Sequence, residues 1–115
     1  MILSRDRSER PWGHFERYTH NQVCTVKIHN VRKGHSSSLQ THTKRAEFFI
    51  ALDDGIVIEV DGNIFHTKAG DEVHVPVGSR HRFSSEVDGA RILEISLGEF
   101  CEDDIIRHED SYGRC

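Results

Sequence analysis

The sequence predicts an all-β protein, a jelly-roll barrel or sandwich of two packed antiparallel sheets, and three observations support this fold class. Short apolar or alternating segments recur about every 8 to 12 residues. Turn-forming residues, chiefly Gly, Pro, Asp and Asn, separate these segments. No long stretch has a convincing helical period. Because 115 residues suit one domain, we expect a single domain over 1–115, with an N-terminal arm (1–20) and a C-terminal tail (99–115).

The first predicted strands are defined by alternation and by the turns that end them. Residues 23–31 alternate apolar and polar side chains, as a half-buried strand does. A polar loop then begins at Lys33-Gly34. Residues 47–52 form an apolar strand that ends at the turn signal Asp53-Asp54-Gly55.

Four more strands follow at further turn signals, over residues 56–60, 64–67, 72–75 and 90–97. Asp61-Gly62-Asn63, between the first two of them, predicts a hairpin turn. Gly98 closes the last one. Residues 102–108 are expected to form one turn of helix, and the tail is expected to fold back beside the barrel mouth. The Arg10-Pro11-Trp12-Gly13 segment is interpreted as an entry strand or latch across the barrel, with Trp12 in the core.

Composition narrows the class of partner. The net charge is −4 and no basic stripe is present, which argues against a nucleic-acid partner. No apolar run approaches the roughly 20 residues of a membrane helix, and the N-terminal residues lack an apolar signal-peptide core, so no membrane partner and a cytoplasmic location are expected. Cys24, Cys101 and Cys115 have no CxxC spacing, which disfavours a disulfide framework or a cysteine zinc site.

The sequence contains nine histidines, an unusual number for its length. Two segments place histidine at spacings typical of metal ligands. In the first, Gly34 precedes Gln40-x-His42, and Glu47 follows. In the second, Gly70 precedes Pro76-x-Gly78 and then His81. Residues i and i+2 of a strand share a face, so Gln40 and His42 project together.

Two imidazoles, a carboxylate and an amide oxygen form a mixed nitrogen and oxygen ligand set. Such a set suits one divalent transition metal, with zinc first and manganese, cobalt, nickel or iron as alternatives. We therefore predict Gln40, His42, Glu47 and His81 as metal ligands. A position left open to water or substrate would make the site catalytic.

The two segments resemble the paired motifs of the cupin superfamily, G(x)5HxH(x)3–4E(x)6G and G(x)5PxG(x)2H(x)3N. The resemblance implies a cupin-type jelly-roll β-barrel. Gln40 stands at the first histidine of the first motif, Asp54 at its closing glycine, and Ser85 at the last asparagine of the second.

A closer resemblance covers nearly the whole chain. The segments RPWGHFE (10–16), SLQ-x-H (38–42), RAE (45–47), EDDIIR (102–107) and D-x-YGR (110–114) are similar to the C-terminal isomerase domain of type II phosphomannose isomerases. Glutamine is the norm at the first ligand position of that family, so Gln40 agrees with it. The family's QxHHHRAEHW becomes QTHTKRAEFF here. A sugar-nucleotide transferase domain usually precedes the family's cupin and is absent from this sequence, which is read as a stand-alone domain.

The resemblance implies a metal-dependent isomerase that interconverts mannose 6-phosphate and fructose 6-phosphate, with a small sugar phosphate as its partner. A base must move a proton between C1 and C2, and Glu94, His66 and His29 on predicted strands are candidates. Arg45, in the RAE triplet, is the favoured catalytic and substrate contact, with Lys44 and Arg80 as further phosphate ligands.

Two other functions remain open at this point. A non-catalytic sugar or sugar-phosphate binding cupin would bind ligands without turnover. A metal-dependent oxygenase would use two histidines and one carboxylate to hold iron. We also expect a homodimer, because small sandwiches cover an exposed sheet edge or face by pairing.

Overall fold

The computed structural model describes residues 6–113 and confirms the all-β fold class, since the described residues form eleven strands and no helix. The strands are β1 (Asp6–Arg10), β2 (Gly13–Arg17), β3 (Cys24–Val31), β4 (Leu39–Thr41), β5 (Ala46–Ala51), β6 (Ile56–Val60), β7 (Asn63–His66), β8 (Glu72–Val75), β9 (His81–Ser85), β10 (Ala90–Leu97) and β11 (Ile106–Glu109). No described helix is long and apolar enough to cross a membrane.

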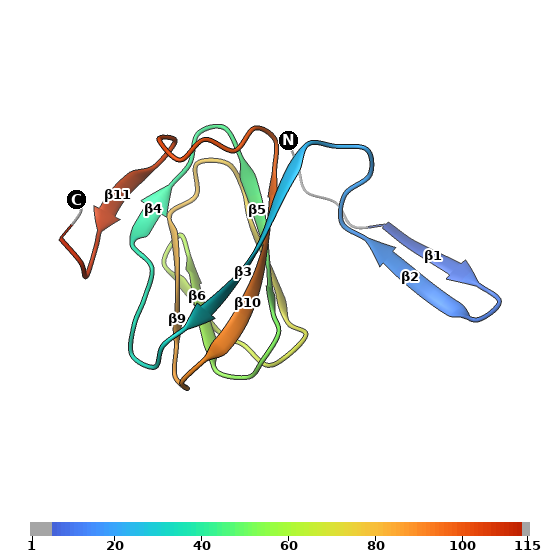
Figure 1. The fold of residues 1–115 in the computed structure, drawn as a ribbon, viewed down its shortest axis with the longest axis horizontal. Helices are drawn as coiled ribbons and strands as arrows, with labels where there is room; N and C mark the ends of the chain where they lie inside the picture. Colours follow the sequence, from blue (N-terminus) through green and yellow to red (C-terminus); the bar gives the residue numbers. More distant parts are fainter. Residues whose placement is uncertain (1–5, 114–115) are drawn as a thin grey trace.

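Two antiparallel sheets form the barrel (Figure 1). One has the strand order β3-β10-β5-β8, and the other has the order β11-β4-β9-β6-β7. The edge strands β3 and β11 therefore belong to different sheets. The strands that carry the predicted ligands, β4, β5 and β9, lie inside this framework, because β4 and β9 pair directly and β5 is central in the opposite sheet.

Alternation along these strands gives the barrel interior two chemically different ends. One end is apolar and fully buried, and its core residues are Val31, Phe49, Ala51, Ile56, Ile58, Val60, Val73, Val75, Ala90 and Ile92. The other end buries polar and charged side chains, among them His42, Arg45, Glu47, His81 and Glu94. The ring of Phe49 lies at the boundary, 6.0 Å from the ring of His81 and 5.8 Å from that of Phe83.

The outer face of the first sheet carries a second apolar cluster. Phe48 and Ile95 are buried there, and the ring of Tyr18 packs edge-on against Phe48. Further along the same sheet, Val26 and Ile28 of β3 are 57% and 55% exposed. The apolar surface of this face therefore continues to the edge of the sheet.

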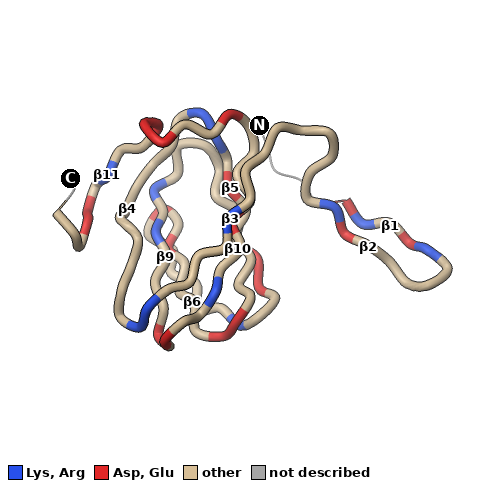
Figure 2. Tube along the Cα trace, in the orientation of Figure 1, with Lys and Arg blue, Asp and Glu red and all other residues tan. Residues whose placement is uncertain are grey.

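β1 and β2 form a hairpin that projects away from the barrel (Figure 1). Charged residues of both signs follow its strands (Figure 2), and Arg17 forms an ion pair with Asp6. Trp12 lies in the turn and is 74% exposed. The expectation of a latch across the barrel with Trp12 in the core is therefore wrong.

The predicted strand positions agree closely with the structure, and the tail differs. Residues 56–60, 72–75 and 90–97 are strands with the predicted bounds. Asp61 and Gly62 both have positive φ, 49° and 83°, as the predicted two-residue hairpin turn requires. The helical turn expected over 102–108 is wrong, because residues 106–109 form β11 and pair with β4. Cys24 and Cys101 are free thiols, and Cys115 lies outside the described residues.

Candidate metal centre

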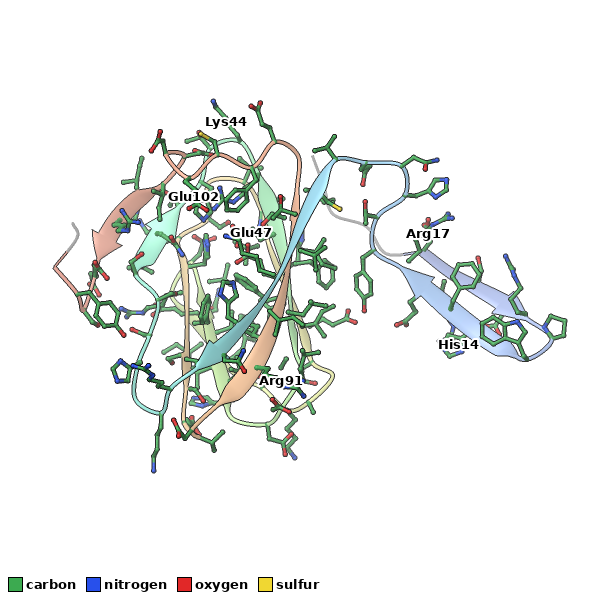
Figure 3. The ribbon with its side chains drawn as sticks, viewed as in Figure 1. His14, Arg17, Lys44, Glu47, Arg91 and Glu102 are labelled. Carbon is green, nitrogen blue, oxygen red and sulfur yellow. The ribbon has the colours of Figure 1, made fainter. Side chains whose placement is uncertain are left out.

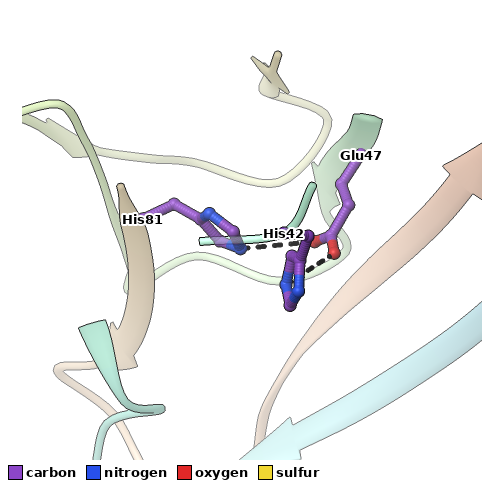
Figure 4. Close-up of side chains that lie close together, drawn as sticks. All are labelled: His42, Glu47 and His81. Carbon is purple, nitrogen blue, oxygen red and sulfur yellow. Dashed lines mark ion pairs between the residues drawn. The ribbon is translucent and has the colours of Figure 1, made fainter. Parts of the chain in front are cut away.

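Three predicted ligands meet at the polar end of the barrel. His42 follows β4, Glu47 lies on β5 and His81 begins β9. All three side chains are buried, and their candidate ligand atoms lie within 4.8 Å of one another (Figure 4). The Nε2 of His42 is 3.1 Å from Glu47 Oε1, and the Nε2 of His81 is 3.6 Å from Glu47 Oε2.

Gln40 belongs to the same layer of the barrel. It is the register partner of His81 across the β4–β9 pair, and directly paired residues point to the same face of a sheet. Gln40 also lines the cavity beside this group. The structure therefore brings all four predicted ligand residues to the same end of the interior, Glu47 from one sheet and the other three from the opposite sheet.

The hydrogen bonds of the two imidazoles leave the Nε2 atoms for a metal. His42 Nδ1 donates to the carbonyl oxygen of Asp104 at 2.7 Å, and His81 Nδ1 donates to that of Ser79 at 3.0 Å. A carbonyl can only accept, so Nδ1 carries the proton and the neutral ring has its lone pair on Nε2. His81 Nε2 is buried without a hydrogen-bond partner among residues 6–113. This donor set, converging on a carboxylate, fits a divalent transition metal.

The electrostatics of the group also favour a cation. Burial by itself raises the pKa of Glu47, but the hydrogen bond with His42, the charges of His81 and His42 and the hydrogen bond from Arg45 outweigh it, so the pKa of Glu47 lies below its ordinary value. Burial lowers the pKa of His81, and the charge of Glu47 offsets this only in part. A neutral imidazole beside an ionised carboxylate is the protonation state that binds a metal.

Arg45 is buried next to the metal group. Its Nε donates to Glu47 Oε1 at 2.9 Å, and its Nη2 lies 3.2 Å from His42 Nε2. The guanidinium carbon lies 4.1 Å from the centroid of the Phe100 ring. Because one lone pair cannot serve two partners, metal binding at His42 Nε2 requires release of the contact with Arg45 Nη2.

A cavity of about 240 Å³ opens beside the metal group. Its lining residues are Lys27, His29, Ser37, Ser38, Gln40, His42, Arg45, Glu47, Phe83, Glu94, Phe100, Glu102, Ile105 and Arg107. Glu94 is 6% exposed, accepts a hydrogen bond from Ser96 Oγ at 2.8 Å and lies 3.0 Å from His29 Nε2. The cavity therefore contains a second buried carboxylate besides Glu47.

The C-terminal tail folds back beside the cavity, as expected. The carboxylate of Asp104 accepts hydrogen bonds from the backbone N–H groups of Thr43 and Lys44 and from the hydroxyl of Thr43, at 2.7 to 2.9 Å. Partial burial by itself raises the pKa of Asp104, but these hydrogen bonds lower it to about 2. Asp104 therefore joins the tail both to the turn after β4 and to His42.

Three other predicted site residues lie outside this cavity. His66 is exposed on β7 and its Nδ1 lies 2.8 Å from Glu86. Lys44 is exposed at the end of the barrel (Figure 3), and Arg80 is exposed, with its backbone N–H bonded to Asp61. None of the three lines the cavity.

The structure also adds residues that the sequence did not point to. Lys27 and Arg107 line the cavity, and Asp104 positions His42 through its backbone carbonyl. The alternation of residues 23–31 places Lys27 on the inward face of its strand, so its position could be predicted. The positions of Arg107 and Asp104 depend on the pairing of β11 with β4, and the helical turn expected over 102–108 did not predict this pairing.

Comparisons with known proteins identify the family of this chain. The family model described as mannose-6-phosphate isomerase C-terminal matches residues 3–110. The alginate biosynthesis protein AlgA of Pseudomonas putida is 35% identical over 107 residues, covering 91% of this chain and 22% of the relative. A mannose-1-phosphate guanylyltransferase of Klebsiella pneumoniae is 34% identical over 110 residues, covering 92% and 23%. The chain thus spans less than a quarter of the length of these two curated relatives.

Solved structures confirm the cupin fold. A sugar phosphate isomerase of the cupin superfamily from Silicibacter pomeroyi aligns with a TM-score of 0.60 and 24% identity, covering 69% of this chain and 52% of the other. ChmJ, a 3'-monoepimerase from Streptomyces bikiniensis, aligns with a TM-score of 0.71 and 11% identity, covering 90% and 66%. At these identities the likeness extends to the fold alone.

Proposed function

This chain belongs to the family of mannose-6-phosphate isomerase C-terminal domains, and we propose that it catalyses the metal-dependent interconversion of mannose 6-phosphate and fructose 6-phosphate. The observation that carries the proposal is the buried His42, Glu47 and His81 group at the wall of a cavity that holds a second carboxylate, Glu94.

The reaction moves a proton between C1 and C2 through an enediol, so the site must hold the sugar and exchange protons with it. Gln40, His42, Glu47 and His81 would hold one divalent metal, zinc first and manganese, cobalt, nickel or iron as alternatives. When bound, the metal supplies polarisation of the sugar oxygens. The supporting observation is that both Nδ1 atoms donate to carbonyls, which leaves the lone pairs on the Nε2 atoms; that of His81 has no hydrogen-bond partner among residues 6–113, and that of His42 contacts Arg45 Nη2.

We assign the proton transfer to Glu94 in preference to His66. Glu94 lines the cavity, and its oxygens are held in place by Ser96 and by contact with His29. A base has to lie within hydrogen-bond reach of the proton that it takes, and His66 faces solvent on β7. His29 would orient the Glu94 carboxylate through its Nε2 contact.

Arg45 is proposed as the residue that balances the buried charge of Glu47 and contacts the substrate oxygen. Its guanidinium already bonds Glu47 and lies near His42. Release of the contact with His42 would leave Nη2 facing the cavity, which Arg45 lines. A fixed cation at this place favours negative charge that develops on an enediol oxygen.

The direct test is a coupled assay for fructose 6-phosphate formed from mannose 6-phosphate, with zinc, cobalt, manganese, nickel and magnesium added separately. We expect metal-dependent turnover in the wild type and loss of turnover in His42→Ala. Glu94→Gln, which keeps the shape of the side chain, should lower kcat while the metal still binds. The proposal fails if the folded, metal-loaded wild type produces no fructose 6-phosphate with any of the five metals.

A second candidate is sugar-phosphate binding without turnover. It is favoured by one observation, the contact of Arg45 Nη2 with His42 Nε2, which occupies a ligand lone pair. In this case metal and phosphosugars would raise the melting temperature, because they bind only the folded state, but no product would form.

We further propose that the chain acts as a homodimer in the cytoplasm. The apolar outer face that reaches Val26 and Ile28 offers a surface for a second copy. The free thiols of Cys24 and Cys101 are typical of a reducing compartment. Light scattering of the purified protein tests the dimer, and a Val26→Lys variant that stays dimeric would exclude this face.

A further inference from the structure

A phosphosugar needs a cationic group in the cavity for its phosphate, and the three cations expected from the sequence do not supply it. Lys44 and Arg80 lie outside the cavity. Arg45 is already paired with Glu47. The phosphate subsite must therefore be sought among the other cavity-lining residues, of which Lys27 and Arg107 are the cations.

Arg107 lies in the same row of side chains as the metal ligands. It is the register partner of Gln40 across the β11–β4 pair, and Gln40 is the partner of His81 across the β4–β9 pair. Residues paired in this way point to the same face. Because neighbouring strands lie about 4.8 Å apart, Arg107 stands two strand spacings, roughly 10 Å, from His81 along this row. A hexose whose C1 and C2 lie at the metal carries its phosphate toward this distance.

Arg107 also has an unsatisfied donor. Its Nε is buried, and among residues 6–113 this nitrogen has no hydrogen-bond partner. A buried guanidinium nitrogen left unpaired is costly unless a ligand supplies an acceptor. Guanidinium binds phosphate through two parallel N–H donors, and a free Nε together with one Nη supplies such a pair.

Lys27 faces the cavity from the opposite sheet. It is the register partner of Glu94, and its Nζ lies 4.1 Å from the centroid of the Phe100 ring. Its one ion pair, with the 83%-exposed Glu102, is 3.7 Å long. Exposed pairs of this kind contribute little, so a phosphate dianion competes with Glu102 for Lys27.

From these observations we propose that Arg107 of β11 and Lys27 of β3 form the phosphate subsite of the cavity. The inference rests on the proposed function, because it assigns the anion of a sugar phosphate. Arg107 gives directional, bidentate recognition, and Lys27 adds a flexible point charge at the mouth. The site therefore selects phosphorylated over neutral sugars.

The test is calorimetric binding of mannose 6-phosphate, mannose and inorganic phosphate to the metal-loaded full chain. Arg107→Ala should weaken mannose 6-phosphate binding by about 10- to 100-fold, since it deletes charge-assisted hydrogen bonds. Arg107→Lys should recover part of the loss, and Lys27→Ala should weaken binding by less than Arg107→Ala. Lys68→Ala, which removes an exposed cation remote from the cavity lining, is the matched control and should bind as the wild type does.

Kinetic measurement separates this inference from the proposed function. If turnover occurs, Arg107→Ala should raise KM for mannose 6-phosphate far more than it lowers kcat. Unchanged affinity in both Arg107→Ala and Lys27→Ala would overturn the subsite, even if the isomerase activity is real. If no turnover occurs but binding is phosphate-selective and both Arg107→Ala and Lys27→Ala weaken it, the isomerase is excluded and the subsite is supported. Failure of the wild type to bind either phosphate compound would overturn the subsite.

Discussion

The two ends of the barrel interior are built from the same strands but bury opposite kinds of side chain. On β5, Glu47 faces the polar end and Ala51 the apolar end, four residues further along the same face. On β9, His81 faces the polar end and Ser85 lies near Ile56. At the apolar end each buried group removes hydrocarbon from water. At the polar end each buried charge depends on a partner. Removing one member of a pair therefore leaves the other charge buried without a partner, which costs free energy.

The comparison predicts its largest effect at Glu47. In Glu47→Ala, Arg45 loses its buried partner, and we expect the free energy of unfolding to fall by about 3 to 5 kcal/mol. The double variant Glu47→Ala/Arg45→Met should regain most of this loss, because it removes the stranded charge as well. Urea unfolding of the metal-free proteins measures both, and a double variant no more stable than the single one would contradict the explanation.

The next effect concerns Asp104, which joins the tail to the polar end. Asp104→Ala deletes three hydrogen bonds to Thr43 and Lys44 and should lower the free energy of unfolding by about 1 to 3 kcal/mol. Asp104→Ala keeps the backbone carbonyl that accepts from His42, but it removes the side-chain bonds that hold this carbonyl in place, so metal affinity should fall by about 10-fold or more. Asp103→Ala changes an exposed neighbour and serves as the control. Equal metal affinities in the two variants would show that the tail does not position His42.

A smaller effect is expected at the apolar end. Ile58→Val removes one buried methylene group and should cost about 1 kcal/mol of stability. The metal dissociation constant should stay that of the wild type, since Ile58 lies in the apolar cluster and does not line the cavity. Metal titration and urea unfolding of one preparation test both halves. A changed metal affinity would mean that the two ends are not independent.

The smallest effect lies outside the barrel interior and depends on pH. Burial lowers the pKa of His74, whose ring stacks with Phe48 and whose Nε2 is buried without a hydrogen-bond partner among the described residues. Below the ordinary histidine pKa of 6.5, the unfolded chain binds a proton that the folded chain does not, so stability falls as the pH drops through this range. His74→Gln should flatten that fall between pH 7 and pH 5. Melting temperatures of the metal-free proteins across this range decide it.

The sequence predicted the barrel well because its signals are local. Residues 56–60 and 72–75 alternate and end at Gly-containing turns, so their bounds could be read directly. The spacing of Gln40, His42, Glu47 and His81 likewise predicted which residues the structure brings together. Their role as metal ligands stays a prediction.

The parts that escaped prediction depend on long-range pairing. β1 and β2 have the charged sequences DRSER and GHFER, which contain no apolar alternation to reveal strands. β11 is short and defined by its register with β4, so a local reading gave a helical turn. The cavity position of Arg107 follows from that same register. The bond from His42 to the carbonyl of Asp104 cannot be read from residue types, because every residue has a carbonyl.

The hydrogen bond between His42 and Asp104 joins positions 62 residues apart in the chain. During synthesis, the ribosome must therefore release 62 further residues after His42 has emerged before this imidazole can acquire its final orientation. Gln40 and Arg107 are subject to the same delay, because β11 can pair with β4 only afterwards. A nascent chain that stalls earlier can fold parts of both sheets, yet its histidine remains free to rotate. The order of translation thus delays maturation of the centre until β11 has emerged.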